Sequence, residues 1–60
     1  MEKLIRAQVL HYRQQAEDAM KRGDEWTHTM IVNEMHGFRM ALEMVLSQSL
    51  IREIFRPTEE

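Results

Sequence analysis

The chain has 60 residues, with eight Lys or Arg against ten Asp or Glu, and its formal net charge is −2. This length allows one domain, residues 1–60, with a marginal core, because short chains bury a small share of their surface. The near-neutral balance argues against a nucleic-acid binder driven by phosphate attraction. The chain contains no Cys, which excludes disulfides, thiolate ligands for zinc and a cysteine nucleophile. We therefore expect a second copy or another partner to supply additional stability.

A first helix is expected from about residue 2 to residue 22. Apolar side chains recur there at alternating spacings of four and three, at Ile5, Val9, Tyr12, Ala16 and Ala19. This is the a/d pattern of a helix that packs against another helix. The opposite side carries Arg, Gln, Glu, Asp and Lys, so it is expected to face solvent.

The sequence Lys21-Arg22-Gly23-Asp24 predicts a tight turn between two helices. Basic residues are common in the last turn of a helix, and Gly readily takes the left-handed position that follows it. Asp then caps the next helix by accepting a hydrogen bond from its exposed backbone N–H groups. Gly23 and Asp24 are thus the predicted residues of the hairpin turn.

A second helix is expected from about residue 25 to residue 46, and its apolar residues span an arc of about 200°. One edge of this arc contains Trp26, Met30, Gly37, Ala41 and Met44. A single partner helix covers a narrower stripe than this, so the apolar residues that it leaves uncovered predict a second packing partner for the helix. Gly37 is costly inside a helix, and we expect it to allow a close approach, with the ring of Tyr12 lying over it.

The C-terminal segment, about residues 48–56, presents apolar residues on nearly the opposite side from the upstream core. Either the helix breaks near Ser47, or its end meets a different surface. A straight helix from residue 25 to 56 would be about 48 Å long and would extend beyond its partner in the hairpin. We expect the segment to cap a dimer or to dock a target, and residues 57–60, after the helix-stopping Pro57, to form a frayed tail.

These patterns predict an all-α antiparallel helical hairpin (about 2–22 and 25–46) with a C-terminal helical extension (about 48–56), dimerising into a helical bundle. Phe38 and Leu42 are expected in its buried core, with Leu46 near the seam between subunits. The residues predicted to form the oligomer interface or bind a partner are Phe38, Leu42, Val45, Leu46, Leu50, Ile51, Ile54 and Phe55.

Few residues suggest site chemistry. Glu25 and His28 form a Glu-x-x-His pair, which in di-iron bundles contributes to a metal site. Glu25 at the start of a helix has a simpler role, because a negative charge there favours the helix dipole. No catalytic constellation is found, and we expect no enzyme activity, no metal and no cofactor.

The favoured function is a small non-enzymatic protein–protein interaction module: a regulator, adaptor or inhibitor of a macromolecular partner, acting as a cytoplasmic homo-oligomer. No apolar run reaches the length of a membrane span. The general organisation is similar to that of compact helical-hairpin accessory proteins of bacteria and their phages. Two alternatives remain open, namely a metal-binding bundle that uses Glu25 and His28, and a weak nucleic-acid-binding architectural protein.

Overall fold

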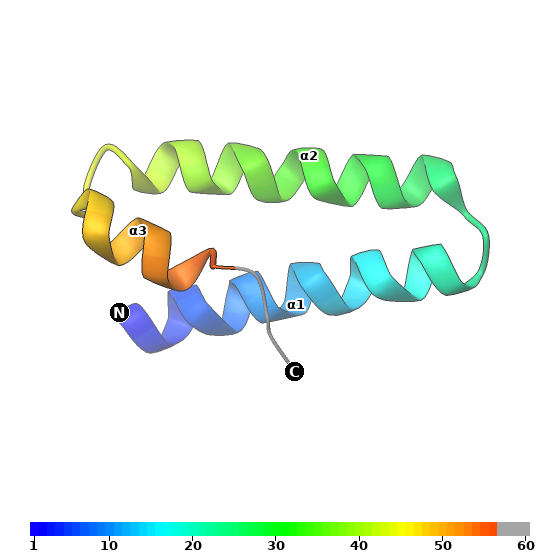
Figure 1. Ribbon diagram of the computed structural model, residues 1–60, viewed down its shortest axis with the longest axis horizontal. Helices are drawn as coiled ribbons and strands as arrows, with labels where there is room; N and C mark the ends of the chain where they lie inside the picture. The colour runs from blue at the N-terminus through cyan, green and yellow to red at the C-terminus, as the bar shows by residue number, and fades with distance from the viewer. Residues whose placement is uncertain (57–60) are drawn as a thin grey trace.

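In the computed structural model, residues 1–56 are described and form three helices: α1 (Glu2–Lys21), α2 (Glu25–Leu42) and α3 (Gln48–Ile54). The helices α1 and α2 lie side by side and antiparallel, and α3 turns back toward the N-terminal half of α1 (Figure 1). No strand occurs in this part of the chain. The prediction of an all-helical hairpin is therefore confirmed.

The turn between α1 and α2 forms as its sequence predicts. Gly23 has a φ of 74°, the left-handed conformation that Gly adopts without a steric penalty. The N–H of Gly23 donates to the carbonyl of Met20 at 3.0 Å, and the N–H of Asp24 donates to that of Ala19 at 2.9 Å. Asp24 Oδ1 accepts from the N–H of Thr27 at 3.1 Å. Hydrogen bonding from Thr27 lowers the pKa of Asp24, because these bonds favour the ionised carboxylate.

The second helix ends earlier than expected. It stops at Leu42, whereas the sequence pattern predicted helix to about residue 46. After a short turn, Ser47 begins α3, and its Oγ accepts a hydrogen bond from the N–H of Leu50 at 3.3 Å. The predicted break near Ser47 is thus confirmed, with the turn before it placed a few residues upstream.

The core is small and includes the C-terminal segment. The buried side chains are Ile5, Val9, Ala16, Ala19, Ile31, Ile51 and Ile54. Ile54 packs with Ile5 and Val9, and Ile51 is completely buried. The expectation that this segment would extend beyond its own hairpin is wrong, because the turn after Leu42 reverses the chain and returns α3 to α1. Phe38 and Leu42 are half-buried and pack against the cluster.

Gly37 does not have the predicted role within the chain. It is exposed, and a Cβ added to it would meet no atom within 4 Å. The ring of Tyr12 contacts Phe38 instead, with ring centroids 5.8 Å apart. The expected close approach at Gly37 is therefore absent within the monomer.

Candidate protein-binding surface

One side of the hairpin is occupied by α3, which arginines from both long helices contact. Arg13 Nη2 of α1 donates to the carbonyl of Arg56 at 2.8 Å. The guanidinium of Arg39, from α2, lies 5.5 Å from the ring centroid of Phe55 in a cation–π contact. These contacts add to the apolar packing of α3, and they show that the side of α2 that carries Arg39 faces α3.

A different side of α2 carries apolar side chains that the chain leaves in solvent. We call it the outer face of α2; it comprises Trp26, Met30, Asn33, Gly37 and Met40, and the exposed Met44 follows in the turn after the helix. Met30 and Arg39 are nine positions apart, which places them about 180° apart around the helix. Trp26 is 73% exposed, Met40 51% and Met44 85%. The outer face therefore points away from the contact between Arg39 and α3.

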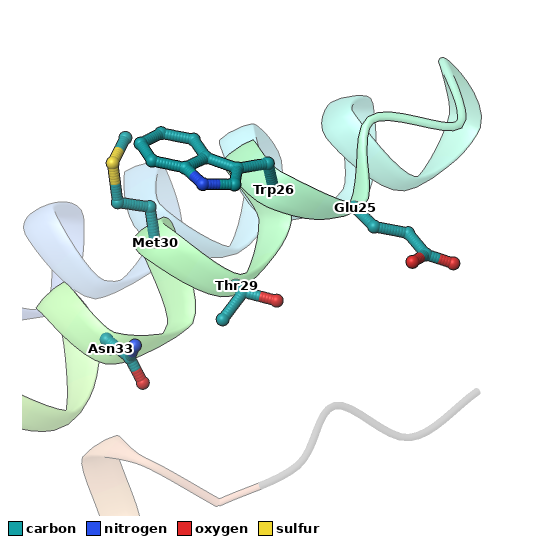
Figure 2. A pocket seen from close by; sticks show the side chains of 5 residues that line it. All are labelled: Glu25, Trp26, Thr29, Met30 and Asn33. Atoms are coloured by element: carbon teal, nitrogen blue, oxygen red, sulfur yellow. The ribbon is translucent and has the colours of Figure 1, made fainter.

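The N-terminal part of this face contains an open hollow of about 550 Å³, lined by Glu25, Trp26, Thr29, Met30 and Asn33. The indole of Trp26 and the thioether of Met30 lie next to each other on one side of the helix, and in this view they point away from the end of α3 (Figure 2). All five side chains come from a single helix. The hollow is therefore part of an exposed surface, and a partner placed over α2 would contact both apolar groups.

A second hollow, of about 190 Å³, lies where α3 meets the hairpin. Its lining combines apolar groups with cations: Arg13, Val32, Met35, His36, Arg39 and Phe55. Two guanidinium groups beside His36 oppose the binding of a metal cation there through charge repulsion. The Glu25–His28 pair also lacks further ligands, because residues 1–56 contain no group of three or more His, Cys, Asp or Glu placed to hold a metal ion.

The predicted interface residues occupy several environments. Ile51 and Ile54 are buried in the monomer core, and Phe38, Leu42, Leu46, Leu50 and Phe55 pack against the core cluster. Val45 is 76% exposed. Their role in contacts between chains stays a prediction, and in this conformation Val45 presents the largest accessible surface among them. Gly23 and Asp24 lie in the turn, as expected.

The sequence prediction of the interface omitted the outer face of α2, although the signal was present. Trp26, Met30, Gly37 and Met44 lie on one edge of the helix by their spacing. What the spacing does not show is which apolar edge meets α1 and which remains in solvent. The contacts of Arg39 and Phe38 resolve that point.

No protein-family model, no curated protein and no solved structure matches this chain. Within residues 1–56, none of the helices combines the length and apolar character that crossing a membrane requires.

Proposed function

We propose that this protein is a small non-enzymatic protein–protein interaction module, a regulator, adaptor or inhibitor that acts as a homo-oligomer on a macromolecular target. The single observation that supports this most is the outer face of α2 with the turn after it, where Trp26, Met40 and Met44 are more than half exposed. A cytoplasmic location belongs to the same proposal, and the lack of Cys is compatible with a reducing compartment.

The physical argument is the cost of leaving this surface in water. Fully burying a Met side chain stabilises by roughly 1.5–3 kcal/mol relative to leaving it exposed. Aromatic residues and Met are enriched in the buried parts of protein interfaces, and Lys and Glu are depleted there. Trp26, Met30 and Met40 match this composition. Large exposed apolar side chains gathered on one helix face favour a site that binds another protein.

The proposal is tested by placing a photo-crosslinking amino acid at Met40 and irradiating cells of the source organism. The expected result is an adduct with another protein. That protein, once purified, should bind the wild-type chain and should bind the Trp26→Asp variant at least tenfold more weakly. Leu10→Asp is the matched control, because Leu10 is also exposed but lies on α1. If only adducts between two copies form, the proposed target is rejected while self-association stands. If no adduct forms, the proposed function is rejected.

A further inference from the structure

We infer that a second copy of this chain docks on the outer face of α2, with the two α2 helices antiparallel and related by a two-fold axis at the level of Met35. This inference rests on the proposed function, because it names the surface through which the proposed homo-oligomer forms. It differs from the predicted C-terminal interface, most of which the monomer uses for its own core.

The arrangement of residues along the outer face is symmetric. Along the sequence, Trp26 and Met44 lie nine positions on either side of Met35, and Met44 belongs to the turn that follows α2. Met30 and Met40 lie five positions on either side, and Asn33 and Gly37 lie two. A two-fold contact places each residue against its counterpart in the partner, so large side chains meet at the two ends. Asn33 and Gly37 then meet near the centre.

Gly37 gains an explanation from this arrangement. Gly in a helix interior costs roughly 1 kcal/mol relative to Ala, and nothing in the monomer lies close enough to require it. Near the centre of an antiparallel contact, the missing side chain permits the partner helix to come close. Opposite Asn33 of the second copy, Gly37 leaves space for the amide side chain.

The area of the contact predicts its strength. With 18 residues, α2 is about 27 Å long. A contact between two such helices buries less than the ~800 Å² per partner of a standard interface and falls among the weaker, reversible ones. Trp26, at 73% exposure, supplies the largest single part, because a buried aromatic side chain contributes roughly 150–250 Å². We therefore expect a dimer that dissociates in the micromolar range.

Sedimentation equilibrium of the full chain tests where the copies meet. Met30→Glu and Met40→Glu are expected to weaken self-association at least tenfold while the helical circular dichroism of the dilute protein is retained. Leu10→Glu places the same charge on exposed α1 and is expected to leave the dimer unchanged. Val45→Glu probes the exposed residue of the alternative C-terminal interface.

Distances between spin labels test the relative orientation of the two α2 helices. The chain has no Cys, so a single introduced Cys can be labelled specifically. Labels on Glu25→Cys in the two copies are expected to lie roughly 30 Å apart along the helices, because each is ten positions from the centre. Labels on His36→Cys are expected to lie much closer together. Short distances at both positions indicate parallel helices and overturn the inference.

Two further outcomes overturn the inference and have different consequences. If Val45→Glu disrupts the dimer and Met40→Glu does not, the copies meet through the C-terminal region, and the proposed homo-oligomer survives. If the wild-type chain remains a monomer up to millimolar concentration, both the inference and the homo-oligomer are rejected. Because the expected dimer is weak and reversible, the second copy and the protein target compete for the outer face. Crosslinking at Met40 therefore tests the target separately, with adducts between copies expected beside those with the target.

Discussion

The two long helices have similar lengths but bury their apolar residues to different extents. α1 buries Ile5, Val9, Ala16 and Ala19, whereas α2 buries only Ile31. α1 presents one apolar stripe, and α2 together with α3 covers it. α2 presents apolar residues over a wider arc, and the chain covers only the part that faces α1 and α3. The monomer therefore covers the apolar stripe of α1 more completely than the wider apolar arc of α2, although Leu4, Leu10 and Met20 of α1 are also exposed.

The largest expected effect comes from truncating the fully buried side chain of α3, the helix that packs against α1. Ile51 in α3 is fully buried, so Ile51→Ala should destabilise the fold by about 2–5 kcal/mol through lost burial and a residual cavity. Because a chain of this size has little stability to spare, thermal unfolding followed by circular dichroism should show most of the cooperative transition lost.

Gln48→Ala is the control for this change, because Gln48 is exposed on the same short helix. If Ile51→Ala and Gln48→Ala melt at the same temperature, α3 does not pack on the hairpin, and the contrast between α1 and α2 disappears.

The sequence predicted the turn and the reversal of the apolar pattern because both depend on local chemistry. Gly23 and Asp24 are residue types that favour a helix end and a helix start, so the turn could be predicted from them directly. The shift of the apolar residues to the opposite side of the helix from Leu50 onward follows from their spacing. The end of α2 at Leu42 was missed because no Gly or Pro marks it. Its position depends on tertiary packing, which a sequence pattern does not encode.

The candidate surface was only partly predictable for the same reason. Helical spacing grouped Trp26, Met30 and Met44 on one edge. The prediction favoured the C-terminal residues because a continuous helix would have carried them away from α1. Once the chain reverses after Leu42, Ile51 and Ile54 become core residues, while Trp26, Met30 and Met40 of α2 remain exposed.

A second prediction concerns the turn that holds α1 and α2 together. Gly23→Val should destabilise by about 1–2 kcal/mol, because a side chain at a φ of 74° approaches the neighbouring carbonyl oxygen. Gly23→Asn should cost less, since Asn tolerates this conformation. Equal urea midpoints for both variants and the wild type would show that the left-handed conformation at residue 23 is not required.

A smaller, pH-dependent effect is expected at the cap of α2. The folded-state pKa of Asp24 lies below the ordinary value of 3.8, so its ionised form stabilises the fold above that pH. This contribution is lost as the pH falls through the lowered pKa. Wild-type melting temperature should therefore decline more steeply below pH 4 than that of Asp24→Asn, whose amide caps the helix at every pH. Parallel pH profiles would contradict a stabilising role of the carboxylate.

The smallest change in stability is expected from the cation–π contact between Arg39 of α2 and Phe55, which follows α3. Arg39→Gln removes the contact with the Phe55 ring, which should cost about 0.5–1 kcal/mol at a partly exposed site, and also the partly exposed ion pair with Glu43, which should add little. Arg52→Gln serves as the control, because Arg52 is exposed on α3. Chemical denaturation that gives equal midpoints for the two variants would assign no stabilising role to the contact.

The most direct test of the account uses the only tryptophan, which lies on the outer face of α2. In the monomer Trp26 is 73% exposed, so dilute protein should emit at the long wavelength of a solvated indole. As the concentration rises through the micromolar range, the account predicts a blue shift that follows the formation of dimer in sedimentation and is absent in Met40→Glu. Emission that remains at the solvated wavelength while the chain dimerises would show that the copies meet elsewhere and would contradict the assignment of this surface.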